Sequence, residues 1–293
     1  MLNICATQLR VSGSLSDNLS RASILISDAA AKGANLVVLP EIFTGTYGVQ
    51  HFADHREAIG LAGGSELLRN SAAQNGCFVV GGVVEESSTS PNTLYNTTVA
   101  YNPRGEEVAR YRKIHLSKVS VGDDATSEAT TFTPGASRSA FTATDGAGND
   151  FQVGLACCFD LRFQEHADKL RRKEGADVIV YSAAWLNSTG MLGHWELMLR
   201  ARALDNQVFC VGSNHAHDSE GETVMYGHSM ITSPWGNVVS RAEDPTKDEG
   251  VFATVTRKEL ADVRERINLT EQRRPECCEC KRRCCYWKWM VLC

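Results

Sequence analysis

The chain has 293 residues, of which 43% are hydrophobic and 22% charged, and its formal net charge is −5 at pH 7. This balance excludes disordered and fibrous proteins and is typical of a globular chain that buries a large core. The charges form no basic stripe, so we expect no nucleic-acid partner and favour chemistry on small molecules. No Gly/Ser/Pro linker divides residues 1–275, which predicts a single domain there.

The 11 cysteines fall into two groups. Six lie between Cys277 and Cys293, and five are scattered through the body of the chain. Scattered cysteines in apolar surroundings are typical of reduced thiols in a cytosolic fold and not of a disulfide framework. The residues after Met1 lack the basic and apolar regions of a secretory signal, and no apolar run approaches the ~20 residues of a membrane span. We therefore expect a cytoplasmic protein.

Strand-length apolar runs alternate with helical patterns in the first 115 residues, which is typical of an α/β protein. The expected strands are 2–9, 35–41, 77–85, 94–102 and 106–115. The expected helices are one capped by Ser16 and closed at Lys32-Gly33, and one over 65–75. The last two strands follow each other directly and join at Pro103-Arg104-Gly105, which predicts an antiparallel hairpin. A mixed sheet is therefore favoured over an all-parallel one.

Residues 117–150 are polar and rich in Gly, Ser and Thr, which predicts a long surface loop. The α/β alternation resumes after it. The expected strands there are 151–158, 177–183, 208–215, two short strands around the Trp235-Gly236 turn, and 250–256; the expected helices are 162–174 and 194–207. Because both halves have the same order of elements, we expect two mixed sheets packed face to face with helices outside.

The segment "QVGLACCFDLRF" (152–163) places two cysteines where an apolar strand ends. Side chains alternate along a strand, so Cys157 and Cys158 cannot both point to one face. Cys158 is the last residue before polar residues begin, and a strand-to-helix turn there would present its sulfur as a nucleophile elbow does. Cys157 would then face the core. Taken alone, the segment fits two buried, inert thiols at least as well.

Two other strand ends carry charges that suit a thiol nucleophile. Glu41 closes the apolar strand "NLVVLPE", where partial desolvation would suit a carboxyl group to acid/base work. In "RYRKIHL", Tyr111, Lys113 and His115 share one face, and a lysine aimed inward could stabilise an oxyanion. Each charge could equally mark a strand end or edge without function.

Taken in order, "LPE" (39–41), "YRKIHL" (111–116) and "GLACCFDLRF" (154–163) resemble the Glu-Lys-Cys triad of the carbon-nitrogen hydrolase (nitrilase) superfamily, over roughly residues 2–275. The resemblance aligns the nucleophile with Cys158 and the base with Glu41, and it pairs Lys113 with the Phe159 N–H as oxyanion donors. The second glutamate of the family falls on Glu128. The resemblance also implies a four-layer α-β-β-α sandwich, a homodimer, a thioester intermediate and no metal or organic cofactor.

Within the superfamily, "PEIFTGTYG", "GHWELMLRARALDNQVF" and "YGHSMITSPWG" look most like omega-amidases, which release ammonia from monoamides such as 2-oxoglutaramate and 2-oxosuccinamate. Tyr47 or Arg162 would then bind the substrate carboxylate, although Arg162 could instead pair with Asp160. Trp185 stands where a small residue or phenylalanine is usual, and we expect it to narrow the acyl pocket. Deaminated glutathione or an N-carbamoyl amine are alternative substrates.

Two further features permit other interpretations. His215 and His217, in "SNHAHD", have a spacing compatible with a metal, but no acidic or cysteine ligands accompany them, so we expect solvent-facing loop histidines. The segment 276–293, "ECCECKRRCCYWKWMVLC", could bind a soft metal, carry S-acyl chains that tether the enzyme to a membrane, or be a disordered terminus. A thiol or metal-binding module that uses this segment is the rival of the enzyme hypothesis.

Overall fold

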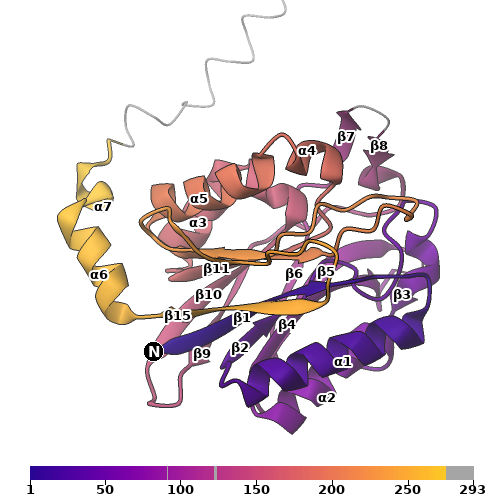
Figure 1. The fold of residues 1–293 in the computed structure, drawn as a ribbon, viewed down its shortest axis with the longest axis horizontal. Coiled ribbons are helices and arrows are strands. Elements are labelled where there is room, and N and C mark those ends of the chain that lie inside the picture. The colour runs from indigo at the N-terminus through magenta and orange to yellow at the C-terminus, as the bar shows by residue number, and fades with distance from the viewer. Residues whose placement is uncertain (91, 122–123, 275–293) are drawn as a thin grey trace, which may run out of the picture.

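The computed structural model describes residues 1–90, 92–121 and 124–274 (Figure 1). The cysteine-rich segment 276–293 lies outside these residues, so the interpretations of it remain untested. The α-helices are α1 (Leu15–Ala31), α2 (Gly63–Asn75), α3 (Gln164–Lys173), α4 (Asn187–Gly190), α5 (His194–Asn206), α6 (Arg257–Arg266) and α7 (Leu269–Gln272), with 3₁₀ turns η1 (Phe52–His55), η2 (Glu128–Thr130) and η3 (Cys158–Arg162). Within the described ranges, no helix combines the length and apolar character that crossing a membrane requires.

Thirteen of the described strands form one mixed sheet, with the central order β6-β5-β4-β2-β1-β12-β11-β10-β9. The strands are β1 (Leu2–Leu9), β2 (Leu36–Val38), β3 (Arg56–Glu57), β4 (Phe78–Glu86), β5 (Leu94–Tyr101), β6 (Glu107–Arg112), β7 (Lys118–Val121), β8 (Asp124–Ser127), β9 (Ser139–Thr144), β10 (Asp150–Cys157), β11 (Val178–Ala183), β12 (Phe209–His215), β13 (Met230–Thr232), β14 (Val238–Arg241) and β15 (Glu249–Val255). The short hairpin β7-β8 stands apart from this sheet.

The expectation of two separate sheets is therefore wrong in its hydrogen bonding. Strand β1 joins the two halves because it pairs in parallel with β2 on one side and with β12 on the other. Strand β15 runs antiparallel to β1 over the length from Leu2 to Gln8 and covers the same edge that β12 reaches only at Gln8 and Leu9. The sheet bends back on itself, so that β10 packs against β5 and β6, and β9 against β6.

Helices cover both outer sides of this folded sheet (Figure 1). Alternate side chains of the strands enter different cores: Leu36 and Val38 join the large core inside the folded sheet, whereas Val37 and Leu39 pack beneath α1 and α2. Figure 1 shows α1 and α2 on one outer side of the strands and α3 and α5 on the other. Burial on both faces explains why these strands are continuously apolar in the sequence.

Three local expectations need correction. Residues 117–150 are not one loop, because they contain the hairpin β7-β8 and the edge strand β9, which pairs antiparallel with β10. These strands are rich in Ser and Thr, and half-exposed edge strands need no apolar run. Ser14, and not Ser16, caps α1, since its hydroxyl accepts a hydrogen bond from the Asp17 N–H. Helix α6 was not expected, and Thr256 caps it through the Glu259 N–H.

Candidate active site

Strand polarity brings three chemical groups to one edge of the sheet. The strands β2, β10 and β6 run in the same direction, because β2 and β4 are parallel and β6 is two antiparallel steps from β4. Glu41 follows β2, Lys113 follows β6, and Cys157 ends β10. The carboxyl ends of parallel strands meet at one edge, which is where open α/β sheets hold ligands.

The backbone around Glu41 is held closely. Its carbonyl accepts a 2.6 Å hydrogen bond from His215 Nε2, and the next residue, Ile42, has a left-handed φ of 44°. A Cβ added to Gly82 on the neighbouring strand would lie 2.6 Å from the Glu41 Cα, so only glycine fits there. These contacts fix the direction in which the Glu41 side chain points.

Four donors surround the Glu41 carboxylate, whose side chain is fully buried. Oε1 accepts hydrogen bonds from Lys113 Nζ at 2.8 Å, Asn96 Nδ2 at 2.6 Å and Cys157 Sγ at 3.1 Å. Oε2 accepts a 2.9 Å bond from the Ala184 N–H. Burial by itself would raise the pKa of Glu41, but Lys113 and these donors lower it below the ordinary value.

Lys113 joins Glu41 to the second glutamate. Its ammonium lies 2.9 Å from Glu128 Oε2, and neither side chain is accessible to solvent. Burial would lower the pKa of Lys113, but the carboxylates of Glu128 and Glu41 raise it well above its usual range. Glu128 is held in turn by the Tyr47 hydroxyl at 3.0 Å and the Ser117 N–H at 2.6 Å. Glu41, Lys113 and Glu128 therefore meet as the sequence predicts, whereas Tyr47 uses its hydroxyl on Glu128.

The two thiols have different surroundings. Cys157 is buried as expected, but its sulfur contacts Glu41 and Asn96 and not apolar side chains alone. Cys158 opens η3 with a left-handed φ of 39°, is 7% exposed and lines a narrow cavity. Burial and the Glu41 carboxylate raise the pKa of both thiols well above the ordinary value, so each is protonated at neutral pH.

A buried carboxylate supports the turn that carries Cys158. Asp160 accepts hydrogen bonds from the Tyr111 hydroxyl at 2.7 Å, His115 Nδ1 at 2.6 Å and the Cys157 N–H at 2.9 Å. A ring nitrogen of the nearby His166 lies within 4.8 Å of a ring nitrogen of His115 and of a carboxylate oxygen of Asp160. Because the carboxylate already serves protein donors, we interpret this cluster as support for the turn and not as a metal site.

The cavity beside Cys158 is built from segments that lie far apart in the sequence. Its walls come from Tyr47, Ser117, Val119, Thr126, Cys158, Phe159, Arg162, Ala184, Trp185, Leu186 and Thr189. The Trp185 indole N–H and the Ser117 hydroxyl are buried and have no hydrogen-bond partner among the described residues. Buried polar groups without partners are rare in folded proteins and indicate places where a ligand or water can bind.

Arg162 gives this cavity a positive charge. Its guanidinium lies 4.7 Å from the Trp185 ring and 5.4 Å from the Phe159 ring, with the nearest polar contact to His194 Nδ1 at 3.4 Å. The guanidinium makes no ion pair with a carboxylate in the described parts of the chain, so the alternative of a structural pair with Asp160 is wrong. Burial lowers the pKa of Arg162 from its ordinary value, which reflects the cost of holding an unpaired cation there.

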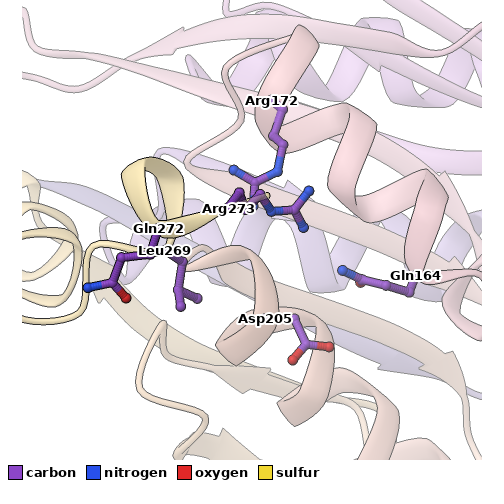
Figure 2. A pocket seen from close by; sticks show the side chains of 6 residues that line it. All are labelled: Gln164, Arg172, Asp205, Leu269, Gln272 and Arg273. Carbon is purple, nitrogen blue, oxygen red and sulfur yellow. The ribbon is translucent and has the colours of Figure 1, made fainter. Parts of the chain in front are cut away.

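A second cavity, of about 400 Å³, lies away from the thiols beside α3, α5 and α7 (Figure 2). It is lined by Gln164, Arg172, Asp205, Leu269, Gln272 and Arg273. Figure 2 shows Arg172 and Arg273 close together, and both bind Asp168, at 2.6 and 2.7 Å. Its cations are thus already paired, and its lining contains no nucleophile.

Sequence reasoning missed three parts of the site. Asn96 lies within β5, where one polar residue among several gives no sign of a role. The Ala184 N–H donor is a backbone group, so the residue type at position 184 does not predict it. His215 was expected to face solvent, but it ends β12, is 3% exposed and binds the Glu41 carbonyl. The expectation failed because His215 was treated as a loop residue, although it falls at the end of the expected strand 208–215.

Taken together, a buried base and an ammonium share a hydrogen-bond network with a thiol, next to a second thiol in a cavity. This combination defines a hydrolase that attacks acyl carbon through sulfur.

Comparison with known proteins identifies the family. The family model for "Carbon-nitrogen hydrolase" matches residues 3–265, so the chain belongs to the carbon-nitrogen hydrolase family and is an enzyme. Omega-amidase NIT2 of Danio rerio is 38% identical over 272 residues, covering 92% of this chain and 94% of that protein. The Homo sapiens omega-amidase NIT2 is 36% identical over 270 residues, with the same coverage. The crystal structure of Saccharomyces cerevisiae Nit3, of the nitrilase superfamily, superposes with a TM-score of 0.80 at 30% identity, covering 93% of this chain and 96% of that one.

Lys113→Met should destabilise the fold by about 3–5 kcal/mol at pH 8, because it leaves two buried carboxylates without their cation. In the native protein the lowered pKa of Glu41 contributes stability above the ordinary carboxyl pKa, and this contribution fades on acidification. In the variant, acid protonates a carboxyl group and relieves the repulsion. The difference between the two proteins in urea denaturation should therefore shrink from pH 8 to pH 5. Lys247→Met, at an exposed pair with Asp244, is the control and should change little; a gap that does not narrow with acid would contradict the buried network.

Proposed function

We propose that this enzyme hydrolyses the terminal amide of small dicarboxylic acid monoamides, of the 2-oxoglutaramate and 2-oxosuccinamate type, and releases ammonia. The observation that carries the proposal is the unpaired guanidinium of Arg162 in the cavity beside Cys158. A cation that faces the nucleophile without a protein carboxylate suits a substrate with a free carboxylate at its far end. The similarity to proteins named omega-amidase supports the same substrate class.

Cys158 is the nucleophile in this proposal. Two features support it over Cys157: its left-handed φ is that of a strained elbow, and it lines the cavity. Cys157 has no accessible surface, although its sulfur lies within hydrogen-bond distance of Glu41 Oε1, at 3.1 Å. A thiol that must meet an amide carbon needs the cavity more than it needs the shorter contact.

The reaction then follows from the positions of the charged groups. Glu41 takes the proton of Cys158 as the sulfur attacks the amide carbon, and Lys113 with the Phe159 N–H stabilises the oxyanion. The C–N bond breaks as Glu41 returns the proton to the departing ammonia, which leaves a thioester on Cys158. Glu41 next takes a proton from water as the water oxygen attacks the thioester carbon, and it returns this proton to the Cys158 sulfur as the C–S bond breaks and the carboxylic acid leaves. Glu128 holds Lys113 in place throughout.

The other walls of the cavity set which acyl chains fit. Trp185 stacks on Arg162 and also contacts Trp195, with 5.3 Å between the ring centroids, so its ring is a fixed boundary. Its unpartnered N–H and the Ser117 hydroxyl can each bind an acceptor oxygen of the substrate, such as the 2-oxo group. A narrow cavity of this kind favours short chains over deaminated glutathione.

We further propose a homodimer in a reducing compartment, the cytoplasm. Large apolar side chains are exposed in and just before α5, at Met191, Leu192, Leu197 and Leu204. Such a group of exposed apolar residues is typical of an interface. The five cysteines in the described body of the chain are all free, which fits a reducing environment.

Replacement of the sulfur at residue 158 tests the nucleophile. Cys158→Ala should lower the rate of ammonia release from 2-oxoglutaramate and succinamate by at least about 10³-fold, because no thioester can form. Cys157→Ser is the matched control and should remain active. Mass spectrometry of the acid-quenched native enzyme should find the acyl group on Cys158. Activity lost with Cys157→Ser and kept with Cys158→Ala would reverse the assignment.

Removal of the cavity cation tests the substrate class. Arg162→Met should raise KM for succinamate by about tenfold or more, the range expected for a charged hydrogen bond. Hydrolysis of butanamide, which lacks the carboxylate, should change little. Arg138→Met, at a surface pair with Glu174, is the control. Equal effects on both amides would contradict the proposal, and preferential turnover of deaminated glutathione or an N-carbamoyl amine would replace the substrate.

A charge placed on the apolar surface tests the dimer. Leu197→Glu should convert the protein from dimer to monomer in sedimentation velocity, because a desolvated carboxylate opposes association. Ile24→Glu, at an exposed apolar side chain on α1, is the matched control and should leave the dimer intact. A native protein that sediments as a monomer would refute this part of the proposal.

A further inference from the structure

We propose that Cys157 is a positioning residue for the amidase reaction: its thiol holds Oε1 of Glu41 in the resting enzyme and yields that oxygen when the base takes a proton from the nucleophile. This inference rests on the proposed function, in which Cys158 forms the thioester. It gives the first of the two adjacent cysteines a role other than packing.

The position of the Cys157 thiol is fixed from several directions. Its residue ends β10, and its N–H donates to Asp160 at 2.9 Å. Its sulfur has no accessible surface and lies 3.1 Å from Glu41 Oε1 and 3.6 Å from Asn96 Oδ1. Because Cys157 has no accessible surface and is not among the residues that line the cavity, the sulfur is placed to act on Glu41 and not on a substrate.

A thiol suits this place because it is a weak donor. Glu41 accepts bonds from the Lys113 ammonium and the Asn96 amide on Oε1, and from the Ala184 N–H on Oε2. To take a proton from Cys158, the carboxylate must free one of the lone pairs that accept these hydrogen bonds. The S–H···O hydrogen bond from Cys157 costs least to break. During the step the proton moves from Cys158 to Glu41 as the sulfur–carbon bond forms, and Cys157 keeps its own proton.

The charged surroundings of Glu41 keep Cys157 in the donor form. Burial and the Glu41 carboxylate hold the pKa of Cys157 well above its usual range, so its thiol stays protonated. The titratable groups that act on Glu41 or lie against it come from several segments: Lys113 after β6, Glu128 in η2, Tyr47 in the loop after β2, Cys157 on β10, Cys158 in η3 and His215 on β12. Cys157 is uncharged and its sulfur contacts Glu41 directly, so its replacement removes a donor to Glu41 without altering a formal charge.

The pH profile of kcat/KM for ammonia release tests the role. Cys157→Ala removes a donor to the ionised base, so the acid limb should move to higher pH by about half a unit to one unit. Cys157→Ser restores a stronger donor, so its acid limb should lie at or below that of the native enzyme. Cys210→Ala, which truncates a buried cysteine on β12, is the matched control and should leave the limb in place.

Several outcomes would overturn the inference. An alanine variant with an unmoved acid limb reduces Cys157 to packing. If that variant does not fold, the serine variant decides, and a limb moved to higher pH refutes the role. Loss of turnover in both variants, while iodoacetamide still labels Cys158, would make Cys157 the nucleophile. A Cys158→Ala enzyme that remains active refutes the proposed mechanism itself, whatever the limb does.

Discussion

The ion pairs of one buried ammonium with two carboxylates impose the main constraint on this structure. Lys113 lies between Glu41 and Glu128, and none of the three side chains reaches solvent. Removing three charges from water is costly, and the attraction among them offsets that cost only when each remaining lone pair and proton finds a partner. Asn96, the Ala184 N–H, the Tyr47 hydroxyl and the Ser117 N–H complete the network. The catalytic arrangement and the integrity of the fold therefore depend on the same contacts.

The curvature of the sheet makes this network possible. Glu41 follows β2 and Cys157 ends β10, and these strands are separated by β1, β12 and β11; Lys113 follows β6, which lies at one end of the order. A flat sheet would hold these groups far apart. Because the sheet turns back so that β10 packs against β5 and β6, the ends of distant strands surround one small volume. The apolar core inside the fold supports this arrangement, and the cavity opens where the core ends.

The sequence predicted the parts of the site that occupy strand ends. Glu41 and Lys113 follow clear apolar or alternating patterns, so their location at the sheet edge could be inferred from periodicity. The partners that complete their bonding could not, because a backbone N–H such as that of Ala184 has no signature and Asn96 is one polar residue within a mixed strand. The surroundings of Cys157 could not be predicted either. Side-chain alternation correctly placed this residue in the interior, but no local pattern reveals that the interior is polar at that point. Strand β9 escaped notice because its residues are small and hydroxylated.

The pairing of β1 has a consequence for how the protein is made. This strand precedes the other described strands in the chain, yet one of its edges is covered by β12 and β15, which end at His215 and Val255. An apolar strand with an unpaired edge is prone to associate with other chains. During synthesis β1 therefore keeps an unpaired edge until β12 and β15 have been made, and the yield in a cell will depend on chaperones that shield β1 until β15 pairs with it.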